Sequence, residues 1–175
     1  MTQRFLVLLF FSIIAAAFAA QARKGERLQL EPNTMAELTV MLSAGDALHG
    51  GLTKQDDEQV DVALRDIELA TRRTISVSAR LKPYVREHLV KVLEVIESNV
   101  GAARNSGHID RRERISDIFN MMANLVRVYS VDARFKIFFC GRDKMTWIQT
   151  KPNGVYPFND SREPAGERNC ALRAP

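Results

Sequence analysis

Several motifs by which enzymes are recognised are missing from this chain of 175 residues. It contains no Gly-x-Ser-x-Gly, no glycine-rich phosphate loop and no His-Glu-x-x-His. Its three histidines, His49, His88 and His108, do not share the spacing of a metal site, and each is predicted to lie on the surface or at a helix end. We therefore predict a protein that binds without catalysis, is not an enzyme and carries no cofactor.

A strong excess of charge of one sign is also missing. Lysine and arginine number 25 and aspartate and glutamate 21, which gives a formal net charge of +4. The basic residues alternate with acidic ones, as in RRERISD at 111–117. Proteins that bind nucleic acid usually cluster their basic residues on one face. Nucleic acid is therefore excluded as the expected partner.

Long hydrophobic runs are absent except at the start of the chain. The run Phe5–Ala20 is interrupted only by Ser12, follows a single arginine, and leads to Ala20-Gln21-Ala22, a small-x-small cleavage site. A spanning helix needs about 20 apolar residues, so the run is short for a membrane anchor. We predict a signal peptide over 1–22, with cleavage after Ala19 as the alternative. The mature protein is expected to be periplasmic or secreted and not membrane-bound.

A polar lead over 23–33 is followed by four segments whose apolar residues recur at helical spacing. Capping boxes at Thr34–Glu37, Thr53–Asp56 and Asp110–Glu113 predict where the first, second and fourth helices begin. Pro83 is expected in the first turn of the third, and Gly50-Gly51 is expected to end the first.

The apolar residues of these segments form the predicted core. In chain order they are Leu38, Met41, Leu42, Leu48, Val60, Leu64, Ile67, Ala70, Val85, Leu89, Val92, Ile96, Ile115, Ile118, Phe119, Met122, Leu125, Val126 and Tyr129. Four amphipathic helices with short connections predict an antiparallel four-helix bundle over 34–130, so the fold class is mainly α.

After Ser130 the pattern changes to short β-favouring runs. RFKIFFC at 134–140 and MTWIQT at 145–150 flank GRDK, which contains turn-forming residues. A β-hairpin is expected there. The remaining residues hold four of the six prolines and are predicted to form a loop-rich tail without regular elements. Residues 131–175 are expected to pack on the bundle as one domain.

The chain has only two cysteines, Cys140 and Cys170, and neither belongs to a Cys-x-x-Cys pair, which argues against thiol redox catalysis. Export into an oxidising compartment favours a disulfide between them that fastens the tail. A metal site built from Cys140, Met145 and Cys170 is the alternative, because thiolates and thioethers select copper(I). Met145 is otherwise expected to fill space in the hairpin.

A resemblance rests on LSAGDALHGGLTKQDDEQVDVALRDIELA, RRERISDIFNMMANLV, IFFCGRDKMTWIQ, VYPFN and NCA. Over roughly residues 36 to 171 the chain resembles a family of exported domains of unknown function. That family occurs alone or joined to periplasmic adaptor subunits of heavy-metal efflux pumps. The resemblance implies a four-helix bundle followed by a cysteine, a tryptophan-containing strand, a proline-aromatic loop and a second cysteine.

On the matching positions, the resemblance assigns these structural roles to Cys140, Trp147, Pro157 with Phe158, and Cys170. The family usually has Cys-Pro-Met where this chain reads Cys140-Gly141-Arg142, so its thioether ligand is missing here.

Two functions are expected, and only the first of them rests on the resemblance. The first is a binding module accessory to envelope metal homeostasis or efflux, whose partner is an envelope protein or efflux component. The second is a structural or protein-interaction module with no metal role.

Overall fold

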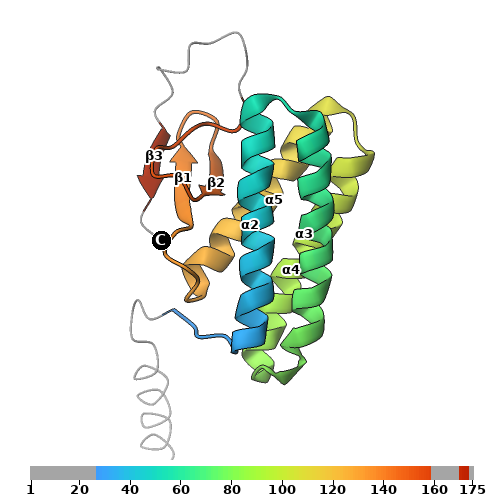
Figure 1. Ribbon diagram of the computed structural model, residues 1–175, viewed down its shortest axis with the longest axis vertical. Coiled ribbons are helices and arrows are strands. Elements are labelled where there is room, and N and C mark those ends of the chain that lie inside the picture. Colours follow the sequence, from blue (N-terminus) through green and yellow to red (C-terminus); the bar gives the residue numbers. More distant parts are fainter. Residues whose placement is uncertain (1–26, 159–169, 174–175) are drawn as a thin grey trace, which may run out of the picture.

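Four long helices and a small sheet make up the part of the protein that can be described (Figure 1). The computed structural model describes residues 27–158 and 170–173, with the backbone alone at 108–109 and 170–173. The predicted signal peptide and residues 159–169 lie outside the described residues. In chain order the helices are α2 (Pro32–Lys54), α3 (Asp57–Val77), the short 3-10 helix η1 (Ser78–Arg80), α4 (Pro83–Asn105) and α5 (His108–Val128).

The helices pack in consecutive pairs, α2 with α3, α3 with α4, and α4 with α5. All the predicted core residues are buried, which confirms the expected apolar faces and the four-helix arrangement. Figure 1 shows α5 running behind α2 toward the sheet. None of the helices in the described ranges is both long and apolar enough to cross a membrane.

The predicted end of the first helix is wrong. Gly50-Gly51 lies inside α2, which continues to Lys54 and ends at Gln55, a residue in the left-handed conformation with φ of 58°. A Cβ on Gly51 would lie only 3.0 Å from a side-chain carbon of Val60. Glycine at this position therefore lets α2 and α3 approach closely, and it does not stop the helix.

The capping boxes are also only partly right. Helix α2 begins at Pro32, whose fixed φ suits a first turn, so Thr34 lies inside the helix and is buried. Asp56, the last residue of the Thr53–Asp56 box, caps α3, because its carboxylate accepts a hydrogen bond of 2.9 Å from the backbone N–H of Gln59. Helix α5 begins at His108, without a side-chain cap.

The sheet contains the predicted hairpin and one further strand. Strands β1 (Lys136–Cys140), β2 (Met145–Gln149) and β3 (Cys170–Arg173) are antiparallel, in the order β2-β1-β3. The expectation that the tail has no regular elements is therefore wrong. Pairing with the open edge of β1 makes Cys170–Arg173 a strand, and such a long-range contact leaves little trace in a four-residue sequence.

Strand β2 is buried along its whole length and packs against α2 and α5. A small residue in α2 allows this close approach. A Cβ on Gly45 would lie 2.6 Å from Sδ of Met122 in α5 and 3.3 Å from Cδ1 of Ile148 in β2. Helix, helix and strand therefore meet at one glycine.

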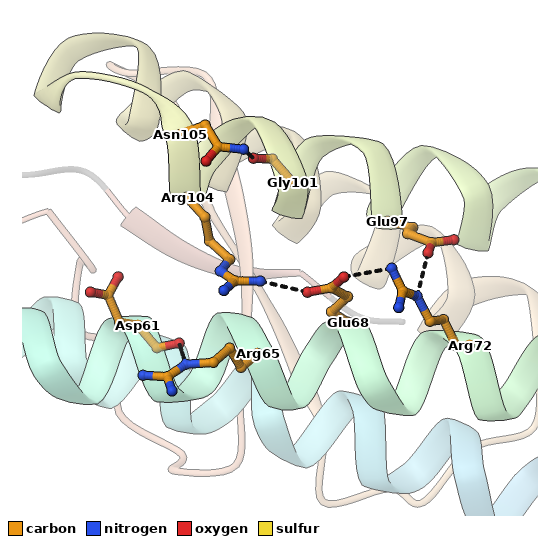
Figure 2. A network of polar contacts seen from close by, with 8 residues as sticks. All are labelled: Asp61, Arg65, Glu68, Arg72, Glu97, Gly101, Arg104 and Asn105. Carbon is orange, nitrogen blue, oxygen red and sulfur yellow. Dashed lines mark hydrogen bonds and ion pairs between the residues drawn. The ribbon is translucent and has the colours of Figure 1, made fainter.

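The outer surfaces of α3 and α4 are joined by ion pairs (Figure 2). Glu68 bridges two arginines, Arg72 and Arg104, each at 2.7 Å, and Arg72 also reaches Glu97 at 2.6 Å. These side chains are partly or largely exposed, and exposed ion pairs contribute little to stability. The network is therefore expected to add little to the stability of the contact between α3 and α4, which depends mainly on apolar packing.

Candidate functional site

The sheet register brings together the three sulfur-containing residues predicted as a disulfide or metal site. Cys140 in β1 pairs with Met145 in β2 on one side and with Cys170 in β3 on the other. Cys140 is a buried free thiol in the structure, and Met145 is buried too. We call Met145, Cys140 and Cys170 the sulfur row.

The backbone geometry of the sulfur row is compatible with a disulfide. Residues directly opposite each other in an antiparallel pair have Cα atoms about 4.5–5.5 Å apart. Disulfides form across Cα separations of about 4.4–6.8 Å. Within 27–158 and 170–173, histidine, cysteine, aspartate and glutamate form no group of three that could hold a metal ion. A metal at the sulfur row would therefore depend on the thioether of Met145.

An aromatic cluster around Trp147 covers the sheet. The indole is fully buried and stacks against Phe138, with ring centroids 5.6 Å apart, while Tyr156 meets it edge-on at 5.8 Å. Pro157 is buried and Phe158 partly buried beside this cluster. The proline-aromatic segment thus lies on the tryptophan strand.

The loop between β2 and this segment is organised by one buried glutamine. Gln149 is 1% exposed, and its Oε1 accepts hydrogen bonds from Trp147 Nε1 at 2.9 Å and from the Val155 N–H at 3.3 Å. Its Nε2 donates to the carbonyl oxygens of Lys151 at 2.9 Å and Asn153 at 2.7 Å. One side chain thus joins the tryptophan to three points along residues 150–155, which we call the 150–155 loop.

Helix α2 holds both ends of the same loop. The Asp46 carboxylate accepts hydrogen bonds from the backbone N–H and the hydroxyl of Thr150, each at 2.8 Å. At the other end, Nε2 of His49 lies 2.7 Å from the carbonyl oxygen of Val155. Although it is held at these points, the loop exposes every residue from Lys151 to Val155.

The middle of the loop lies against an aromatic ring. A Cβ on Gly154 would lie 2.5 Å from a ring carbon of Phe138, so the backbone here rests directly on the phenyl group. Any larger residue would lift the loop from the aromatic cluster. Glycine therefore sets the distance between the loop and the sheet.

His49 was expected on the surface or at a helix end, and this expectation is wrong. Because α2 continues past it, His49 is only 7% exposed, and its ring stacks parallel to Trp147 with centroids 6.5 Å apart. Burial lowers the pKa of His49. The hydrogen bond to Val155 and the charge of Asp46 act in the opposite direction, and Lys151 adds a smaller lowering effect.

A hollow of about 260 Å³ lies beside the sulfur row. Its walls include Met145 and Arg112. The guanidinium of Arg112 lies 4.8 Å above the ring of Phe158 and donates a 3.0 Å hydrogen bond to Tyr156. The Asp143 carboxylate lies 4.0 Å from the same guanidinium. Burial, followed by a hydrogen bond to Asp143, raises the pKa of Tyr156 to about 12. One wall of the hollow therefore carries a cation, and its tyrosine stays protonated.

The side chains that hold the 150–155 loop could not be identified from the sequence. Asp46 and His49 lie in a helical pattern whose apolar positions give no indication of a distant partner, and Gln149 ends a strand as an ordinary polar residue. A histidine one turn after an aspartate on a predicted helix was the only available hint.

Comparisons with known proteins provide no relative from which a function could be transferred. No family model matches the chain, and neither the curated proteins nor the solved structures contain a significant match. The 150–155 loop and the sulfur row are therefore the features on which a function can rest.

Proposed function

We propose that the chain is an exported, non-catalytic binding module that contacts a protein of the cell envelope through the 150–155 loop. One observation carries this proposal. All residues from Lys151 to Val155 are exposed, whereas Gln149 and His49, which hold them, are buried. Loops positioned by a rigid scaffold are the usual carriers of binding function.

Pre-organisation is what makes such a loop effective. Ordering a flexible loop on binding costs free energy that reduces affinity, and a loop ordered in advance avoids most of that cost. Here the contacts from Asp46, His49 and Gln149 provide this order before any partner arrives. The loop also combines a charged residue, Lys151, with the apolar side chain of Val155, which is 44% exposed.

A Cys140–Cys170 disulfide is part of the proposal. The register supports it by placing the two residues opposite each other on β1 and β3. Closing a loop of about 31 residues should stabilise the fold by roughly 3–4 kcal/mol in the chain-entropy model. The bond would hold β3 on the sheet beside β1.

A second candidate function is an accessory role in envelope metal homeostasis or efflux. The observation that favours it is Met145, which lies directly opposite Cys140 in the sulfur row. Two thiolates and a thioether would suit copper(I). This function requires reduced cysteines, so it competes with the disulfide for the same atoms.

The state of the sulfur row distinguishes the two candidates. We expect a thiol count under denaturing conditions to find no free thiol in freshly exported protein, and non-reducing peptide mapping to recover Cys140 linked to Cys170. Reduction or Cys170→Ser should then lower the free energy of unfolding by about 3–4 kcal/mol. Two free thiols would refute the disulfide. Stoichiometric copper(I) binding that is lost in Met145→Leu would then support the metal role.

The loop is tested by site-specific photo-crosslinking in cells. A photoreactive residue at Asn153 should form one discrete protein adduct, whereas the same residue at Arg86, exposed on α4, should not. Gln149→Leu should weaken the Asn153 adduct because it frees the loop without altering the exposed residues. Equal adducts from both positions, or an adduct that persists undiminished in Gln149→Leu, would refute a pre-organised binding loop.

A further inference from the structure

His49 lies where α2, β2 and the 150–155 loop meet. Because a carbonyl oxygen can only accept, the Nε2 that lies 2.7 Å from Val155 carries the proton and donates it. The His49 ring stacks on the face of Trp147. Only 7% of the residue is exposed to water. The neutral ring therefore connects the end of the loop to the helix and to the aromatic cluster.

The charged groups that act on this ring come from two elements. Asp46 of α2 favours a charged histidine, but its carboxylate is already engaged by Thr150, and Lys151 of the loop opposes the charge. Strand β2 offers the uncharged face of Trp147. Its centroid lies 6.5 Å from that of His49, beyond the ~6 Å at which cation–π attraction is significant. Burial is the largest effect, and it disfavours the charged ring.

We propose that His49 is a pH-sensitive latch for the 150–155 loop. When the ring is neutral, it holds Val155 against α2 and keeps the loop closed over Trp147. When the ring is protonated, the closed loop must bury a positive charge, and opening of the loop returns that charge to water. The effect is confined to the loop, because the core of the four helices is formed by apolar side chains that do not titrate.

The direction of the pH dependence follows from proton linkage. In the open loop His49 is solvated and has an ordinary pKa of about 6.5. In the closed loop the pKa is lower. The latch is therefore fully effective above pH of about 6.5, and the closed loop loses stability as the pH falls from there toward the lower, closed-loop pKa. Below that value, further acidification has no additional effect through this group.

The latch would regulate the 150–155 loop, which is the surface proposed to bind the envelope partner. Its biological role therefore rests on the proposed function. The latch itself is a property of the isolated chain. Its test therefore measures the loop and uses no partner. A failure of the partner assignment would leave the result unaffected, and a failure of the latch would leave the binding loop in place.

Amide hydrogen exchange provides the first measurement. In the mature protein we expect the protection factors of the Thr150 and Val155 amides to fall several-fold between pH of about 7.5 and about 5, after correction for intrinsic exchange, while those of α5 do not. The single tryptophan gives a second readout, because Trp147 stacks on His49. Its fluorescence should titrate with a midpoint below about 6.5.

Three variants make the test specific. His49→Gln keeps an N–H donor for Val155 but cannot titrate, so both pH dependences should disappear. His49→Phe keeps the stacking and removes the donor, so protection should be low at every pH. His88→Gln is the matched control, because His88 lies on α4 and hydrogen-bonds Tyr129 instead of the loop. The pH dependence of loop protection in this variant should equal that of the unmodified protein.

The latch is refuted if loop protection does not change with pH, or if His49→Gln retains the change. Loss of helical circular dichroism over the same pH range would also refute it, because the acid transition would then be global.

Discussion

The helices and the sheet region of this protein are held by different kinds of contact. Between α2, α3, α4 and α5, apolar side chains recur every three or four residues, and those predicted to face the core do so. Around the sheet, single polar side chains act over long sequence distances, such as Asp46 on Thr150 and His49 on Val155. Each buried apolar side chain stabilises the helices through the area it removes from water, whereas each polar contact fixes one point of the loop. The two regions should therefore respond differently to substitution.

The largest effect is expected in the helices. Phe119 of α5 is fully buried, and Phe119→Ala should cost about 3–5 kcal/mol through lost burial and the remaining cavity. Urea unfolding followed by circular dichroism measures this loss. Val62→Ala is the control, because Val62 is 45% exposed and its truncation should hardly move the midpoint. Equal midpoints for Phe119→Ala and the unmodified protein would mean that Phe119 does not belong to the helical core.

An intermediate effect is expected at Gln149. Gln149→Leu leaves the N–H groups of Trp147 and Val155 and two loop carbonyls without this partner, and an unsatisfied buried polar group costs about 1–3 kcal/mol. Exposed groups of the opened loop would recover part of this by binding water. Proteolysis should then cleave the 150–155 loop faster while the helices stay intact. Unchanged cleavage would show that the loop does not depend on Gln149.

This contrast also explains what the sequence could predict. Helical spacing and β-favouring runs are local, so the four helices, their core faces and the hairpin were predictable from the residues. The glycines were misleading, because Gly51 serves a close approach to Val60, and a helix-ending glycine looks the same in sequence. Strand β3 and the loop partners of Asp46 and His49 depend on contacts across many residues, for which a single sequence gives no pattern.

The smallest effect is expected in the ion-pair network between α3 and α4 that Figure 2 shows. Glu68 contacts both Arg72 and Arg104, and its side chain is 21% exposed, so it should couple more strongly to Arg104 than two fully solvated groups would. A double-mutant cycle of Glu68→Gln with Arg104→Gln measures this coupling energy. The comparison pair is Glu87 and Lys91 of α4, which are 67% and 71% exposed.

We expect the coupling of Glu68 with Arg104 to exceed that of Glu87 with Lys91, and both to remain below the effect of Gln149→Leu. Screening gives the decisive check, because the Debye length falls from about 10 Å at 0.1 M salt to about 3 Å at 1 M. The coupling should shrink accordingly in high salt. If it stayed constant, or equalled the cost of Phe119→Ala, the pairing of α3 with α4 would depend on charge, and the distinction between a periodic apolar region and a polar, single-contact region would fail.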